Sequence, residues 1–208
     1  MTTSRELEAF IGALPADPVD AAGYVLGTER NASTPLEFWA FVDPSHYLQL
    51  DDVVHVRSPL PDGQQIDVYG VVDEVRATQE GVRFTSDVAL TRAGVLPAET
   101  AVAAHVSVTR VEPEIFVPPM PGQAVERAQG EAREQALFFD QMRTRIPLGV
   151  SRSGEPVLGN FDFLNGTRGA HVNISGISGV ATKTLVTHLV TEYRDAFRVV
   201  HDEPGESC

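Results

Sequence analysis

Residues 65–78, QIDVYGVVDEVRAT, form a valine-rich run of the kind that builds β-strands. Val68, Val72 and Val75 do not follow one strict alternation, so we expect a bulge or bend near Gly70. Further β-prone runs lie on both sides of this one, which makes β-structure the main expectation for the first half of the chain.

These runs lie between Gly23 and about Pro118. They are GYVLGTE, EFWAFV, DVVHVRS, VRFTSDVAL, AAHVSVTRV and EIFV. Turn signals separate them at intervals of about 8–15 residues, for example Asp43-Pro44, Pro61-Asp62-Gly63 and Glu80-Gly81. Short strands at such intervals are typical of a closed barrel or a sandwich.

A helix is predicted on either side of the β-rich region. Residues 1–21 form an N-terminal helix or arm, which we interpret as a surface helix that packs on the next domain. Its apolar residues at helical spacing are Leu7, Phe10, Ile11 and Leu14. The proline-rich VPPMPG at 117–122 indicates a domain boundary. Apolar residues then recur at three- and four-residue steps over 123–142, which predicts a connector helix.

Charge is distributed unevenly along the 208-residue chain, whose formal net charge is −13. Residues 1–121 hold 7 arginines and 18 acidic residues, a net of −11, whereas residues 122–208 carry a net of −2. An acidic surface repels a phosphate backbone, so the first part is a poor nucleic-acid-binding face. The chain has 15 arginines and a single lysine, Lys183.

The sequence shows no pattern of a membrane span, a secretory signal or a disulfide framework. No run approaches the roughly 18 consecutive apolar residues of a transmembrane helix. The N-terminus is acidic and lacks the basic-then-apolar order of a signal peptide, and the one cysteine is Cys208. We therefore expect a soluble cytoplasmic protein with no membrane partner.

Titratable residues of the β-rich region form no catalytic or metal-binding pattern. Asp51 and Asp52 are adjacent, and adjacent side chains on a strand point to opposite faces, so we interpret them as a solvated strand entry. His55 and His105 lack the paired spacing of metal ligands and are interpreted as ordinary barrel residues.

The clearest site pattern begins at His171–Ile174, a short β-prone run. A loop with Gly176 and Gly179 follows, and then Lys183-Thr184 and an apolar helical stretch. A phosphate-binding P-loop has the same order, which is a strand, a glycine-rich loop, a Lys-Thr pair and a helix. In such a loop backbone N–H groups hold the β-phosphate, the lysine contacts the β- and γ-phosphates, and the threonine hydroxyl binds Mg²⁺.

The spacing departs from the usual G-x-x-x-x-G-K-[ST], which requires glycine where Ile177 and Thr182 stand. On spacing alone, a nucleotide site and a glycine-rich turn into a helix are both open. The nucleotide site is favoured because Lys183 is the only lysine in the chain. A serine-hydrolase elbow, G-x-S-x-G around Ser178, is excluded because Val180 occupies its last glycine position.

Four motifs carry a resemblance to a known family. They are LEFWAFVDPSHYLQLDDVVHV and YGVVDEV in the β-rich region, IPLGVSRSGEPV after the predicted connector helix, and GAHVNISGISGVATKT. Their order resembles the bacterial HerA family, hexameric DNA-pumping ATPases of the HerA–FtsK group with an N-terminal HAS-barrel. The resemblance covers about Gly23 to Thr184. Its most specific part is the ISGISGVATKT loop, whose ATKT looks like a variant of GKT used within one bacterial branch.

The resemblance implies a mainly β N-terminal barrel followed by the incomplete beginning of an α/β P-loop domain of the RecA-like type. It divides the chain into an N-terminal helix or arm at 1–21, a HAS-like β-barrel at 22–120, a linker helix at 121–145 and a partial P-loop NTPase domain at 146–208.

The resemblance also implies a function, that of an ATP-dependent DNA translocase or helicase in DNA end processing or phage defence. It implies a hexamer whose barrel docks a NurA-type nuclease or another effector, and DNA contacts made by regions outside this chain. It assigns ATP binding to Gly176, Ser178, Gly179, Val180, Ala181, Thr182, Lys183 and Thr184. Lys183 would contact the phosphates, Thr184 would bind Mg²⁺, and Gly179 and Thr182 would shape the loop.

Only 24 residues follow Thr184, too few for the acidic Walker B strand that a P-loop ATPase uses. We therefore expect a truncated or frameshifted HerA-like protein that does not hydrolyse ATP alone, and we assign no catalytic residue. Two alternatives stay open. One is a non-catalytic barrel module for hexamer assembly or nuclease binding, and the other is a relic of a disrupted gene.

Overall fold

The computed structural model describes residues 21–79, 81–82 and 84–164. The chain divides into two compact units, Met1–Asp140 and Gln141–Cys208. The first unit contains a β-barrel, and the described part of the second contains a β-hairpin. The predicted N-terminal helix and the predicted P-loop lie outside the described residues.

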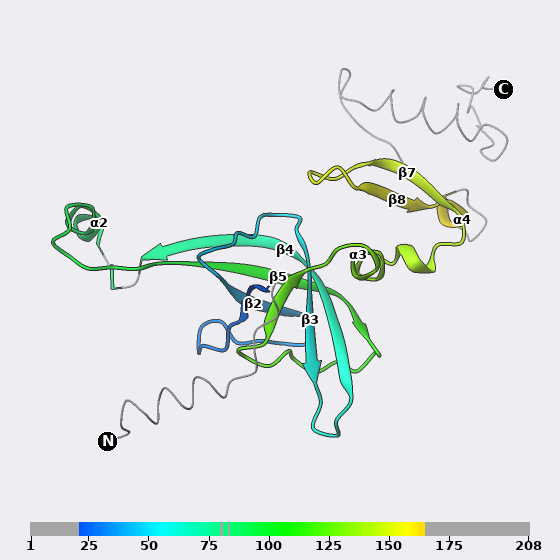
Figure 1. Cartoon of the computed structure of the whole chain (residues 1–208), viewed down its shortest axis with the longest axis horizontal. Helices are drawn as coiled ribbons and strands as arrows, with labels where there is room; N and C mark the ends of the chain where they lie inside the picture. Colours follow the sequence, from blue (N-terminus) through cyan, green and yellow to red (C-terminus); the bar gives the residue numbers. More distant parts are fainter. Residues whose placement is uncertain (1–20, 80, 83, 165–208) are drawn as a thin grey trace, which may run out of the picture. The chain divides into compact units, whose positions relative to one another are not determined.

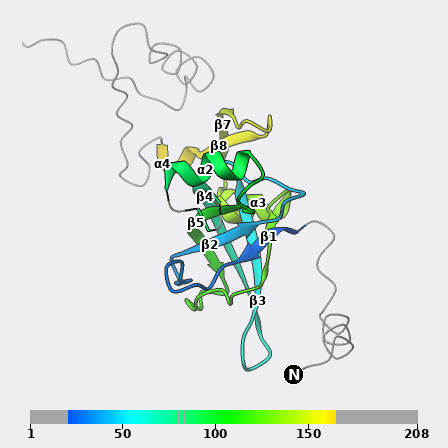
Figure 2. The same ribbon diagram turned by 90° about the vertical axis from the view of Figure 1, so that its left-hand side faces the viewer.

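The first unit contains a closed antiparallel barrel of six strands, in the order β1-β2-β5-β4-β3-β6 (Figures 1 and 2). The strands are β1 (Ala21–Val25), β2 (Glu37–Val42), β3 (Val53–Pro59), β4 (Gln65–Gln79), β5 (Thr100–Glu112) and β6 (Ala124–Arg127). Because β6 pairs with both β1 and β3, no gap is left between the first and last strands. The prediction of a β-barrel is confirmed, and the sandwich alternative is wrong.

Small and β-branched side chains fill the barrel interior, as expected where six strands leave little space. Strand β2 shows the alternation clearly, because Phe38, Ala40 and Val42 are buried while Glu37 and Trp39 lie on the outer face. The core residues are Ala22, Val25, Phe38, Ala40, Val42, Leu48, Val54, Val56, Ile66, Val68, Val72, Ala104, Val106, Val111 and Val125.

Strands β4 and β5 contain two register shifts, which confirm the predicted irregularity near Gly70. The first lies between Tyr69 and Gly70 and leaves Thr109 of β5 without a partner, and the second leaves Asp73 of β4 without one. Gly70 is required at this position, since a Cβ there would lie 2.4 Å from Cγ1 of Val106. Such bulges bend a strand and redirect single side chains.

Beyond the barrel, β4 and β5 continue as a two-stranded arm out to the pair Gln79 and Thr100, and helix α2 (Thr85–Arg92) follows at its end (Figure 1). The prediction of a strand at 82–90 is therefore wrong. The backbone N–H of Phe84 donates to the Asp87 carboxylate at 3.0 Å, and this contact stabilises the start of the helix. No barrel strand lies beside this segment to pair with it as a strand. No residue of α2 is buried.

The predicted connector helix over 123–142 is wrong in its first part, because Ala124–Arg127 form strand β6. Pairing with the edges of β1 and β3 outweighs local helix propensity there, and it buries Val125 completely. The helical part is limited to α3 (Glu131–Ala136) and the 3-10 turn η1 (Phe139–Gln141).

The predicted strand EIFV at 114–117 is wrong as well. Prolines on both sides lack a backbone N–H donor, and the segment instead forms tight turns, in which Ile115 N–H donates to the Pro113 carbonyl.

In the second unit, β7 (Arg145–Val150) and β8 (Pro156–Asn160) form an antiparallel hairpin, and α4 (Phe161–Leu164) follows. Gly154 allows the turn because its φ is +81°. Within the described part of the chain, no helix has the length and apolar character needed to cross a membrane.

Candidate functional site

The predicted ATP site lies in a part of the chain that the structure does not describe. None of its residues is among those that the structure describes; they are Gly176, Ser178, Gly179, Val180, Ala181, Thr182, Lys183 and Thr184. Thr184 is the predicted Mg²⁺ ligand. Both the nucleotide site and the magnesium site therefore stay predictions. The described residues bring polar side chains together in other places, among them an outer face of the barrel and a pocket.

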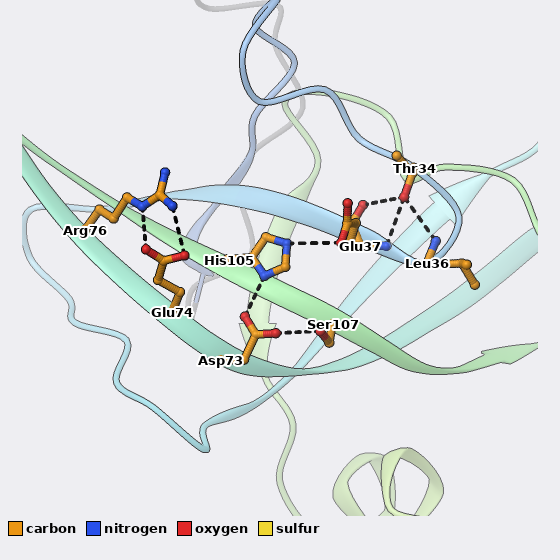
Figure 3. A network of polar contacts seen from close by, with 8 residues as sticks. All are labelled: Thr34, Leu36, Glu37, Asp73, Glu74, Arg76, His105 and Ser107. Atoms are coloured by element: carbon orange, nitrogen blue, oxygen red, sulfur yellow. Dashed lines mark hydrogen bonds and ion pairs between the residues drawn. The ribbon is translucent and has the colours of Figure 1, made fainter.

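The first place is the outer face of β2, β4 and β5, shown in Figure 3. Its members come from segments far apart in the sequence, and we call them the His105 cluster. They are Glu37, Trp39, Asp73, Glu74, Arg76, His105 and Ser107, of which Figure 3 draws all except Trp39.

Asp73 is the central acceptor of this cluster. Its Oδ1 lies 2.5 Å from Nδ1 of His105, and the Ser107 hydroxyl donates to its Oδ2 at 2.6 Å. Asp73 is the residue that the second bulge leaves without a ladder partner, and its carboxylate lies against these two β5 side chains. The other ring nitrogen of His105 lies 3.5 Å from the Glu37 carboxylate, so the imidazole lies between two acidic groups.

Trp39 lies between two cationic or potentially cationic groups. Its ring centroid is 5.0 Å from that of His105, and the Arg76 guanidinium carbon is 4.5 Å from the Trp39 ring. Arg76 also donates to both carboxylate oxygens of Glu74, at 2.5 and 3.0 Å. These hydrogen bonds raise the pKa of Arg76 above its ordinary range.

Partial burial raises the pKa of Asp73, but the hydrogen bonds from Ser107 and His105 outweigh that effect. The pKa of Asp73 therefore lies below its ordinary value of 3.8, and the carboxylate is ionised at neutral pH. The negative charge holds the two β5 side chains in place.

The geometry does not support nucleophilic catalysis, although serine, histidine and aspartate occur together. Ser107 donates to Asp73 and not to His105, so the imidazole is not placed to take a proton from its hydroxyl as in a Ser-His-Asp triad. Among the described residues, no group of three or more metal-ligating side chains is placed to hold a metal ion. A partly buried tryptophan beside an arginine and several half-exposed carboxylates is instead typical of a protein-contact surface.

His55 has a structural role that agrees with its interpretation as a barrel residue. Its ring stacks on Tyr69 with centroids 4.9 Å apart, and its Nε2 lies 2.8 Å from the Asp67 carboxylate. The Tyr69 hydroxyl donates to the side chain of Gln135 at 2.5 Å and so ties the barrel to α3. Burial raises the pKa of Tyr69 above 10.0, and the charge of Asp67 adds to this effect.

The second place is a pocket of about 350 Å³ on the barrel. Residues of β1, β3, β6, the loop before β3 and α3 contribute to it. The lining residues are Ala22, His46, His55, Glu126, Arg127, Gln129 and Ala132. Glu126, Arg127 and Gln129 are not predicted as site residues by the sequence pattern, because they fall in the segment that the pattern indicates as helical.

No protein-family model matches the chain, and no curated protein is a detectable match to it.

Proposed function

We propose that the chain is the N-terminal portion of a HerA-type ATP-dependent DNA translocase, cytoplasmic and hexameric in its intact form, that acts in DNA end processing. The observation that carries this proposal is the closed six-stranded antiparallel barrel at the N-terminal side of the predicted P-loop. A barrel in this position is what the resemblance to HerA proteins implies.

In this proposal the two parts of the chain have different tasks. The loop at 176–184 binds ATP, with Lys183 on the phosphates and Thr184 on Mg²⁺. The barrel faces other proteins, because the acidic charge of residues 1–121 is unfavourable for contact with a DNA backbone.

Nucleotide binding by the full chain tests the proposal. A fluorescent ATP analogue titrated in the presence of Mg²⁺ is expected to bind, and Lys183→Ala is expected to abolish binding because the loop loses its only mobile cation. The matched control is Arg194→Ala, which removes the same charge beyond the loop and is expected to bind normally. Binding that survives Lys183→Ala, or no binding by the unmodified chain, contradicts the proposal.

A second candidate function is a non-catalytic module that binds a NurA-type nuclease or a neighbouring subunit through the barrel. The observation that favours it is the His105 cluster, in which Trp39 lies on an outer face beside three half-exposed carboxylates. Exposed tryptophan and arginine side chains dominate many protein interfaces.

This second function is tested by measuring the affinity of the full chain for a NurA-type nuclease without nucleotide. Trp39→Ala is expected to weaken binding about tenfold or more, as for an interface hot spot. Val150→Ala is the control, because Val150 is 75% exposed and belongs to β7 in the second unit. Equal affinities for both variants would contradict the assignment.

A further inference from the structure

The outer part of strand β4 has a free edge among the residues that the structure describes. On one side, β4 pairs with β5 as far as Gln79 (Figure 1). On the other side, its pairing with β3 ends at Val71, and the backbone of Val72 bonds to that of residues 51–52. Over residues 73–79, alternate backbone N–H and C=O groups therefore point away from β5 with no strand beside them in the described part of the chain.

This edge is open to solvent. The side chains of Glu74 and Arg76 are 46% and 56% exposed, and Ala77 and Thr78 are exposed as well. Glu74 and Arg76 lie on one face of the strand (Figure 3), whereas Val75 lies on the other and packs partly against the core. A two-stranded arm is only marginally stable by itself, so a further strand along this edge would stabilise it.

We propose that this edge pairs with the same edge of a second copy of the chain, antiparallel and about a two-fold axis at Val75. In this register Glu74 of each copy lies opposite Arg76 of the other, and the two Val75 residues face each other. Opposite charges and β-branched side chains directly across a strand pair both stabilise it. The pairing is centred on residues 74–76, because the edge is already occupied as far as Val72.

The signs of the two charges select this register. An axis one residue earlier would place Glu74 opposite Glu74 of the other copy, and an axis one residue later would do the same for Arg76. Like charges directly opposite each other destabilise a strand pair. Charges on an edge strand usually keep other strands away. Here they alternate in sign, so an identical edge fits when its axis lies at Val75.

The charge of the arm favours a second copy as the partner. Residues 74–100 contain 3 arginines and 4 acidic residues, a net of −1, whereas residues 1–121 together carry −11. Two copies therefore repel each other least through the arm, and a strongly basic partner would instead be attracted to the more acidic remainder. A two-fold contact joins two copies and closes on itself. The inference does not rest on the proposed ATP or DNA function.

Sedimentation equilibrium of the full chain at physiological ionic strength tests the proposal. We expect the mass to double as the protein concentration rises, whichever unit other contacts form. Arg76→Glu and Glu74→Arg each place like charges opposite each other at two symmetry-related positions. Each is therefore expected to raise the dissociation constant about tenfold or more. The double variant, Glu74→Arg with Arg76→Glu, restores opposite charges and is expected to associate like the unmodified chain.

A mixture of the two single variants separates pairing between copies from the ion pair within one copy. Each single variant loses the contact between Glu74 and Arg76, but the two variants carry opposite charges along the edge. We therefore expect an equimolar mixture to regain the affinity of the unmodified chain. The matched control is Arg152→Glu, which makes the same charge change at an exposed position of the second unit. It is expected to leave the dissociation constant within about twofold.

The proposal is overturned if the mass of the unmodified chain does not double, or if either single variant associates as strongly as the unmodified chain. It is also overturned if the mixture stays dissociated while the double variant associates, because the two charges would then act within one copy. Nucleotide binding is measured separately through Lys183→Ala, so a failure here leaves the proposed ATP site unaffected.

Discussion

Asp73 stands outside the β4–β5 ladder, and its carboxylate lies 2.5 Å from Nδ1 of His105. These residues are 32 positions apart in sequence, and a bulge brings them together on the outer face of the barrel. A bulged residue contributes no ladder pair. The Asp73 side chain nevertheless connects β4 to β5 by accepting from His105 and Ser107.

Asp73→Ala should destabilise the barrel, because it removes the acceptor of both β5 side chains. We expect a loss of about 1 kcal/mol in the free energy of unfolding, at the low end for hydrogen bonds to a charged group since the site is half exposed. Urea denaturation measures the change. Glu99→Ala is the control and is expected to stay within about 0.5 kcal/mol, because Glu99 is exposed and lies just before β5. If Asp73→Ala and Glu99→Ala changed the free energy of unfolding equally, the stability of the barrel would not depend on the Asp73 carboxylate.

The depressed pKa of Asp73 predicts a specific loss of stability in acid. Its pKa in the folded protein lies below 3.8, so the folded state binds fewer protons than the unfolded state in that range. The contribution of Asp73 is complete above pH 3.8 and is lost as the pH falls through the folded pKa. Urea denaturation at a series of pH values should therefore give a shallower acid decline for Asp73→Ala. Parallel curves for the two proteins would contradict this prediction.

Gly70→Ala should be strongly destabilising for a steric reason. The added Cβ would lie 2.4 Å from Cγ1 of Val106 and 2.7 Å from the Ser107 carbonyl oxygen, so β4 and β5 would have to separate. We expect a loss of about 1–3 kcal/mol, the range for overpacking. Gly63→Ala is the comparison, because Gly63 has a φ of +87° but open space around it. It should cost about 1 kcal/mol or less in denaturation experiments. If Gly63→Ala lowered the free energy of unfolding more than Gly70→Ala, backbone conformation and not packing would be the main reason for glycine at these positions.

Helix α2 should tolerate substitutions that the barrel does not. Val88 on α2 is 48% exposed, whereas Val125 on β6 is fully buried. Val88→Ala is expected to change the free energy of unfolding by less than about 0.5 kcal/mol, and Val125→Ala to lower it by about 1–3 kcal/mol. Thermal denaturation of both variants makes the comparison. A large loss for Val88→Ala would mean that α2 is packed in solution.

Strands were predicted well where side-chain pattern and tertiary pairing agree. EFWAFV matches β2 because its alternation also decides which side chains enter the core. Two segments failed for opposite reasons. VRFTSDVAL overlaps helix α2 from Thr85 onward, at the end of the arm, where no barrel strand is available to pair with it. AVER has a helical pattern but forms β6, because the edges of β1 and β3 would otherwise stay unpaired.

The polar sites were harder to predict than the strands. The contact of His105 with Asp73 depends on a register shift, and a single sequence does not specify the register of two paired strands. Glu126 was missed because its position on the outer face follows only from its strand assignment. The loop at 176–184 shows a local motif that sequence alone can indicate, and its ATP site stays a prediction.

The last strand of the barrel has a consequence for synthesis of the protein. Strand β6 pairs with β1 about one hundred positions earlier, so a growing chain cannot complete the barrel until residue 127 has left the ribosome. Until then β1 and β3 both present free backbone donors and acceptors, which are templates for wrong pairing with other nascent chains. Slow elongation before this point would therefore favour aggregation, and protection by a chaperone would matter most between the emergence of β3 and the emergence of residue 127 from the ribosome.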